Sequence, residues 1–176
     1  DIATNPGISV RFSALHPRYE VSQRDRVLED LVPVVRDLAA RAAKLKIGFN
    51  VDAEEQDRLE LSLEVIERVL EDERLAGWNG FGIVVQAFGP RAAAAIDWIG
   101  DTAERLDRKL MVRLVKGAYW DTEIKLAQQE GLERFPVFSR KPATDVSFAA
   151  NARKLLARRD RIYPQFATHN AHTVAA

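Results

Sequence analysis

The fold class of this chain is decided by the stretch LMVRLVKGAYWD, residues 110–121. Its apolar run, broken only by Arg113, is typical of a buried strand in a parallel sheet. The run ends at Lys116, and a Gly-Ala turn and two aromatic residues follow, so the strand end presents two cations, main-chain amides and two flat rings. Such an end suits a planar, anionic ligand. Cations that extend to solvent beside packed aromatics would give the same pattern, and this stretch alone leaves both interpretations open.

Similar apolar runs recur along the chain and alternate with amphipathic helical patterns. Strands are expected at residues 8–15, 47–51, 81–88, 110–116 and 162–168. Apolar residues at helical spacing predict helices over residues 27–45, 59–70, 90–106, 121–130 and 144–155. Pro33 should kink or restart the first of these helices, and Thr144 or Asp145 should cap the last. Residues 173–176 are expected to lie inside a further helix.

Five apolar strands separated by helices predict an α/β fold with a parallel sheet. Either a doubly wound open sheet or part of a (βα)8 barrel would satisfy this pattern. No Gly-x-Gly-x-x-Gly turn follows the first strand, which argues against a dinucleotide-binding doubly wound unit. Polar residues instead stand at successive strand ends: Arg11, Asp52, Gln86, Arg113 with Lys116, and His169 with Asn170.

A ring of polar groups at strand ends is how a barrel builds an active site, and a complete barrel takes about 250 residues. The 176 residues therefore predict a partial TIM-like barrel of about five β/α units that lacks the final strands. On this interpretation residues 1–176 form one piece of a domain in a longer protein.

Composition excludes several classes of function. Twenty-six Lys and Arg balance 26 Asp and Glu, so no basic field predicts contact with nucleic acid. The absence of Cys removes disulfides, thiolate metal sites and thiol nucleophiles. No apolar run reaches the ~20 residues of a membrane span, and no signal peptide opens the chain. A cytoplasmic protein is expected, with peripheral membrane contact left open.

Asp52 and Gln86 each allow two interpretations. Asp52 could pair with an ammonium group or orient a cation, but the residues alone favour a helix N-cap with Glu55 at the third position. Gln86 ends an apolar strand, and its amide could bind a ligand or a neighbouring strand end. His169 and His172 have a spacing that a helix could bring to one face, although only His16 offers a third imidazole. A metal-dependent hydrolase is therefore the weakest hypothesis.

Five stretches together resemble the proline dehydrogenase family, and in particular the dehydrogenase domain of the bacterial bifunctional proline utilisation A proteins. They are GISVRFSALHPRY (7–19), DAEEQDRLE (52–60), LAGWNG (75–80), RLVKGAYWD (113–121) and YPQFATHNAHT (163–173). The resemblance covers nearly the whole chain. It implies a (βα)8 barrel with non-covalently bound FAD that oxidises L-proline to Δ1-pyrroline-5-carboxylate and passes the electrons to a quinone.

The resemblance also implies roles for individual residues. Flavin contacts are implied for Gln86, Arg113, Val115, Lys116, Gly117, Trp120, Ser139, Thr168, His169 and Asn170. Arg113 and Lys116 are placed near the redox end of the isoalloxazine, where a cation stabilises the anionic reduced flavin. Substrate contacts are implied for Arg11, Asp52, Ala118 and Tyr119, with Asp52 as an active-site carboxylate.

Two features of this chain depart from the family pattern. Arg11 stands where the family usually has Lys; it can still pair with a carboxylate, but it needs more room. Ser139 stands where Thr is common. The later strands of the family supply an arginine pair for the substrate carboxylate, and these residues are absent here. A non-catalytic barrel fragment is therefore the main alternative to an enzyme. The resemblance further allows peripheral contact with the inner membrane and a fused aldehyde dehydrogenase module.

Overall fold

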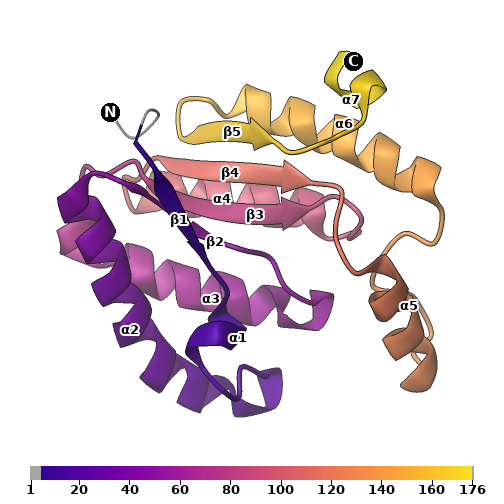
Figure 1. Ribbon diagram of the computed structural model, residues 1–176, viewed down its shortest axis with the longest axis horizontal. Helices are drawn as coiled ribbons and strands as arrows, with labels where there is room; N and C mark the ends of the chain where they lie inside the picture. The colour runs from indigo at the N-terminus through magenta and orange to yellow at the C-terminus, as the bar shows by residue number, and fades with distance from the viewer. Residues whose placement is uncertain (1–4, 176) are drawn as a thin grey trace.

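The five expected strands form one parallel sheet, which confirms the α/β class and the five β/α units (Figure 1). The computed structural model describes residues 5–175. The strands lie in chain order, and they are β1 (Gly7–Val10), β2 (Gly48–Val51), β3 (Phe81–Gln86), β4 (Leu110–Val115) and β5 (Ile162–Phe166). Each strand pairs in parallel with the next.

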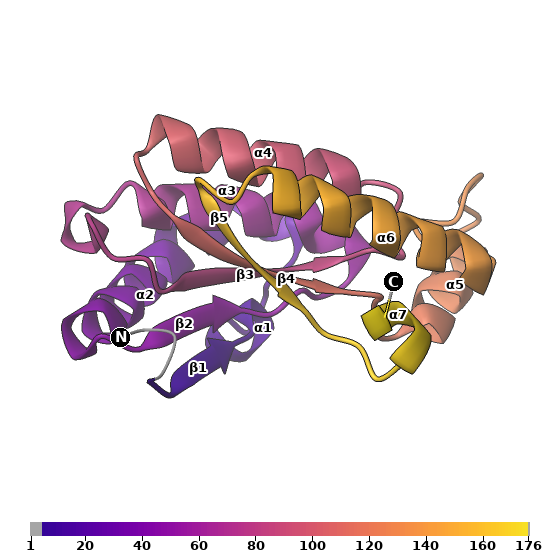
Figure 2. The same cartoon turned by 90° about the horizontal axis from the view of Figure 1, so that it is seen from above.

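Helices connect the strands. The α-helices are α1 (Phe12–Leu15), α2 (Arg24–Leu45), α3 (Leu59–Leu70), α4 (Ala92–Arg105), α5 (Trp120–Gln129), α6 (Lys141–Ala157) and α7 (Ala171–Ala175). The short 3₁₀ turns within residues 5–175 are η1 (Val21–Gln23), η2 (Gln56–Arg58) and η3 (Glu73–Leu75). Seen from above, α3, α4 and α6 lie along one side of the sheet (Figure 2).

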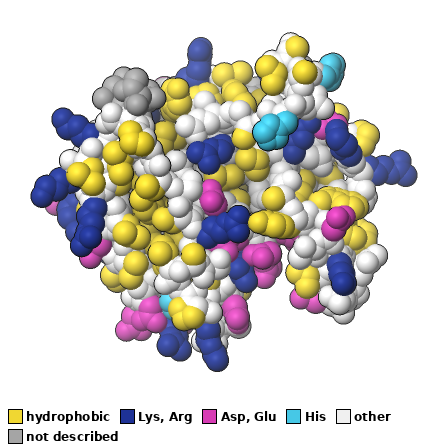
Figure 3. All heavy atoms as spheres, in the orientation of Figure 1, with side chains coloured by type: hydrophobic (Ala, Val, Ile, Leu, Met, Phe, Trp, Pro, Cys, Tyr) yellow, Lys and Arg dark blue, Asp and Glu magenta, His cyan; other side chains and the backbone are white. Residues whose placement is uncertain are grey.

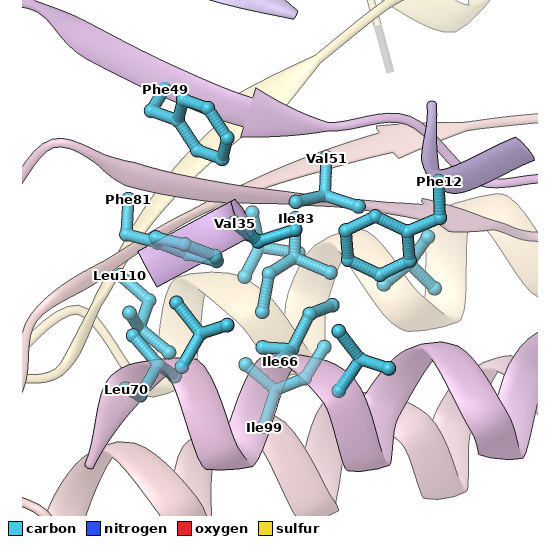
Figure 4. Packing of buried hydrophobic residues seen from close by; sticks show 14 of the residues in the cluster. Phe12, Val35, Phe49, Val51, Ile66, Leu70, Phe81, Ile83, Ile99 and Leu110 are labelled. Atoms are coloured by element: carbon cyan, nitrogen blue, oxygen red, sulfur yellow. The ribbon is translucent and has the colours of Figure 1, made fainter. Parts of the chain in front are cut away.

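The hydrophobic core lies between the sheet and these helices. Alternate strand residues face the helices, as a pleated strand requires, and Phe49, Phe81 and Leu110 are nearly fully buried. They pack with Ile66 of α3 and Ile99 of α4 (Figure 4). Complete burial of one such side chain contributes about 1.5–3 kcal/mol. This side of the sheet is therefore the part that holds the five units together.

The opposite, inner face of the sheet carries polar side chains. Asn50, Arg113 and Gln165 lie there with Met111 around one cavity. Gly82 makes room for this arrangement, because a Cβ at that position would lie 1.9 Å from Asn50 Oδ1. The oxygens Asn50 Oδ1 and Gln165 Oε1 are buried and have no hydrogen-bond partner within residues 5–175.

The first predicted strand is too long. β1 ends at Val10, and Phe12–Leu15 forms α1 instead of continuing the strand. The register explains this, because Val10 pairs with Val51 and β2 ends there, so the chain has no partner strand beyond that point. Phe12 turns into the core and makes an edge contact with Tyr19, with the ring centroids 5.6 Å apart.

One expectation about a helix end is wrong, and one of the two outcomes expected at Pro33 is not observed. α2 runs through Pro33 as one helix, so the helix does not restart there. Seven buried side chains on both sides of Pro33 offset its cost of about 3 kcal/mol. α6 begins at Lys141 with Pro142 in its first turn, so neither Thr144 nor Asp145 caps it. The side chain of Asp145 is instead held by two lysines.

Candidate functional site

A cavity of about 560 Å³ opens where the strands end. Strand ends and the loops after them contribute most of its lining. Eleven of the predicted site residues line it: Arg11, Asp52, Gln86, Val115, Lys116, Gly117, Ala118, Tyr119, Thr168, His169 and Asn170. Figure 3 looks across the strands, in the orientation of Figure 1, and shows Lys, Arg and His side chains beside acidic ones near α7. The structure thus brings together residues that are up to 159 positions apart in the chain.

The turn after β4 is shaped by Gly117 and Tyr119. Gly117 has φ +131°, and a Cβ there would lie 2.4 Å from the ring of Phe88. The main-chain NH of Phe88 donates to the carbonyl of Lys116 at 2.7 Å, which fixes the turn to the end of β3. Tyr119 follows in the left-handed region at φ 64°. A non-glycine residue in that region costs on the order of 1–3 kcal/mol, and such strain is common at binding sites.

Gln86 joins the loops that follow β2 and β4. Its Nε2 donates to the carbonyl of Glu54 at 2.9 Å, and its Oε1 accepts from the NH of Ala118 at 3.3 Å. Of the two interpretations of Gln86, the bond to neighbouring strand ends describes this structure. The amide therefore sets the distance between the loop that carries Asp52 and the loop that carries Tyr119.

Asp52 is not a helix cap, although the residues alone favoured that interpretation. Residue 55 is still extended, η2 begins only at Gln56, and its N-cap Glu55 makes no side-chain capping bond. The main-chain NH of Asp52 instead bonds to the carbonyl of Val10 at 2.9 Å. This bond keeps the residue at the strand end, where its half-buried side chain lines the cavity.

Arg11 and Tyr119 meet across the mouth of the cavity. An Nη of Arg11 donates to the hydroxyl of Tyr119 at 3.2 Å, and the guanidinium lies 5.9 Å from the centre of the ring. Both contacts join the end of β1 to the loop after β4. The implied carboxylate ligand Arg11 and the implied pocket wall Tyr119 are therefore neighbours.

Lys116 is held in the cavity wall by three contacts. Its Nζ donates to Asp145 Oδ1 at 2.6 Å and to Thr173 Oγ1 at 3.1 Å, and it lies 5.8 Å from the centre of the Phe148 ring. Hydrogen bonds from Lys116 and then from Lys141 hold the pKa of Asp145 below its usual value.

Three of the predicted site residues lie outside the lining of this cavity. Arg113 stands two residues before Val115 on the inner face, and it lines a second cavity of about 490 Å³ with Asn50 and Gln165. Two residues of parallel strand span roughly 7 Å. Trp120 donates from Nε1 to the carbonyl of Phe138 at 2.8 Å, which brings the implied contacts Trp120 and Ser139 near each other at the start of α5.

Sequence reasoning missed Glu123 and the role of Asp145. Glu123 is a nearly buried carboxylate on α5, and its Oε1 accepts from the NH of Gln56 at 2.8 Å. Burial raises the pKa of Glu123. Its position four residues before the buried Ala127 on the same helix face is the signal that could have found it. For Asp145, the signal is Lys141 four residues earlier.

His169 and His172 do not form the start of a metal site in the part of the chain that the structure describes. Within residues 5–175, no three His, Asp or Glu side chains gather closely enough to hold a metal ion. The hypothesis of a metal-dependent hydrolase gains no support from this geometry.

The sequence profile of proline dehydrogenase matches residues 1–176. The chain belongs to the proline dehydrogenase family. Its curated relatives include the bifunctional protein PutA of Salmonella typhimurium, which is 57% identical over 175 residues, and that of Rhizobium meliloti, which is 56% identical over 176 residues. Each match covers 99% of this chain but only 13% and 14% of the relatives.

Solved structures of proline dehydrogenase family members show the same fold. A variant of PutA from Bradyrhizobium japonicum is 61% identical, with a TM-score of 0.96 over 97% of this chain and 18% of its own. PutA from Bdellovibrio bacteriovorus, inactivated by N-propargylglycine, is 30% identical, with a TM-score of 0.90 over 95% of this chain and 17% of its own. The five units therefore match the barrel-type dehydrogenase domain, and the doubly wound alternative is set aside.

No helix within residues 5–175 has both the length and the apolar character that crossing a bilayer requires.

Proposed function

We propose that residues 1–176 are part of the (βα)8 barrel of a proline dehydrogenase and that the complete protein oxidises L-proline to Δ1-pyrroline-5-carboxylate with FAD. One observation carries this proposal: Arg11, Asp52, Lys116 and Tyr119 together line one cavity at the strand ends. Membership of the family and a PutA structure described as having proline bound in remote sites support the choice of substrate.

The chemistry of the cavity lining fits a flavin dinucleotide. Lys116, Lys141, Arg11 and His169 offer positive or donor groups to an anion, and Asn170 and Thr168 offer neutral hydrogen bonds. In our proposal the cofactor is held by Lys116, Thr168, His169 and Asn170 together with the implied contacts Gln86, Arg113, Val115, Gly117, Trp120 and Ser139. When bound, FAD would supply the acceptor for the hydride of the ring carbon that is bonded to nitrogen and does not carry the carboxylate.

The residues of this chain then bind and orient the substrate. Arg11 binds the carboxylate of proline, and Asp52 balances the charge of the ring nitrogen. Ala118 and Tyr119 form the pocket walls and exclude water. Arg113 and Lys116 supply positive charge that favours the reduced, anionic flavin. Because the hydroxyl of Tyr119 already accepts from Arg11, the same tyrosine also orients the guanidinium.

The reduced flavin must be reoxidised, and we propose a membrane quinone as the acceptor. This choice requires the complete protein to work on the cytoplasmic side and to touch the inner membrane surface. Because the matched relatives are bifunctional proteins of which this chain spans 13–14%, we also propose a fused aldehyde dehydrogenase module in the complete protein.

Absorbance spectra of the complete protein test the proposal. We expect flavin bands in the purified protein and their bleaching when L-proline is added without oxygen. Arg113→Met should weaken FAD binding or lower the reduction potential, since it removes a cation from the inner face beside the flavin. A colourless protein that gains no flavin bands with added FAD would contradict the proposal.

A further inference from the structure

Asp145 lies between two lysines at the edge of the cavity. Its Oδ1 accepts from Lys116 and its Oδ2 accepts from Lys141, each at 2.6 Å. Lys141 is 70% exposed, whereas Lys116 is only 23% exposed. One carboxylate thus links an outer cation to an inner one, and each of its oxygens binds one ammonium group.

The inner lysine is fixed from three sides. Besides Asp145, it contacts the hydroxyl of Thr173 and the face of Phe148. A lysine on a flexible four-carbon stem loses about 2 kcal/mol of rotamer freedom when it is held in one place, so several contacts are needed to fix its position. Of the three, only Asp145 also opposes the charge of Lys116.

We propose that Asp145 is a positioning residue for the flavin chemistry, because it holds the ammonium of Lys116 at the cavity wall and moderates the positive charge that the cofactor meets. The inference rests on the proposed function, since it assumes that FAD occupies this cavity. Asp145 acts only through Lys116 and touches neither substrate nor cofactor itself.

The pairing differs from an ordinary surface ion pair. Exposed pairs contribute about 0–1 kcal/mol and are screened by salt. Lys116 is mostly buried, and Asp145 comes from α6 while Lys116 follows β4, so this bond joins two separate elements at the site. Lys141 alone, four residues before Asp145 on the same helix, would make only a surface pair.

The reduction potential of bound FAD in the complete protein tests the inference through a double-mutant cycle. Asp145→Asn should raise the potential, because the charge of Lys116 is no longer opposed. Lys116→Met should lower it. In the Lys116→Met background, Asp145→Asn should then cause no further shift, since there is no ammonium left to position.

Asp97→Asn is the matched control. Asp97 on α4 is also a carboxylate shared by two cations, Lys154 and Arg158 of the α6 region, but it does not line the cavity. Its substitution should leave the potential unchanged.

The outcomes separate this inference from the proposed function. A protein that binds FAD and oxidises proline, but whose potential does not rise with Asp145→Asn, overturns the inference alone. A rise of the same size with and without Lys116 also overturns it, because Asp145 would then act directly. A protein that binds no flavin overturns both.

Discussion

The helix-facing side of the sheet differs from the inner face in whether its buried groups find partners within this chain. On the helix side, Phe81, Val112 and Leu114 are buried among residues of this same chain. On the inner face, Asn50 Oδ1 and Gln165 Oε1 are buried without a hydrogen-bond partner within residues 5–175. The first face accounts for the stability of the five units, whereas the second is built for contacts that these units do not supply.

The largest expected effect is a loss of proline oxidation, and it follows from the unpartnered inner face. The 176-residue chain alone should show no measurable proline oxidation, because on the proposed function the arginines that bind the substrate carboxylate come from strands beyond these five. Misplacement by about 1 Å can already cost roughly 100-fold in rate. An assay with proline, added FAD and an artificial electron acceptor checks this. Turnover near that of a full-length relative would show that the substrate site is complete within this chain.

Phe81→Ala should strongly lower the free energy of unfolding, because Phe81 packs on the helix-facing side of the sheet. Phe81 is almost fully buried against Phe49 and Trp78, and such a truncation costs about 3–5 kcal/mol. Urea unfolding of the complete protein measures the loss. Val84→Ala is the control on the inner face of the same strand, where the residue is only half-buried and should cost less than half as much. Equal losses would remove the distinction between the two faces.

Asp52→Ala should lower proline oxidation by roughly 100-fold or more, as expected for a positioned charged group in an active site. Its melting temperature should hardly change, because Asp52 caps no helix. Asp72 is the matched control: it does cap η3, accepting from the NH of Arg74 at 2.9 Å. Asp72→Ala should cost about 1 kcal/mol of stability with normal turnover. The reverse pattern would restore the capping interpretation of Asp52.

The smallest expected effect concerns the pH dependence of stability at Glu123. Burial raises the folded-state pKa of this carboxyl, so the folded protein binds its proton more tightly than the unfolded chain does. Stability should therefore fall as the pH rises from the ordinary value of 4.5 through the raised pKa. Glu123→Gln should remove this part of the slope, measured by urea unfolding between pH 4 and 7. An unchanged slope would show that another group is responsible.

Much of the fold could be predicted from the sequence because it depends on local periodicity. The apolar runs around Ile83 and Val112 alternate with helical stripes, and no distant residue is needed to interpret them. The end of β1 could not be predicted, because it is set by where β2 ends, which only the pairing register reveals.

The site could be predicted in part for the same reason. Strand ends identified Asp52, Gln86 and Lys116 as residues that line one cavity, and the structure confirms that they do. Asp145 and Glu123 lie on helices, and their partners are 29 and 67 residues away. Local spacing could have marked both positions, but the bonds to Lys116 and Gln56 are tertiary contacts that no local pattern encodes. The catalytic and binding roles of the site residues stay predictions.

Gly82 and Asn50 illustrate how the inner face limits change over evolution. Any side chain at position 82 would meet Asn50 Oδ1, so a substitution there forces the buried Asn50 side chain to move, which a smaller residue at position 50 avoids. The two positions, 32 residues apart and paired in register across β2 and β3, should therefore vary together among related sequences. Such coupling limits which single mutations the barrel interior tolerates. It does so even though neither residue lines the cavity at the strand ends.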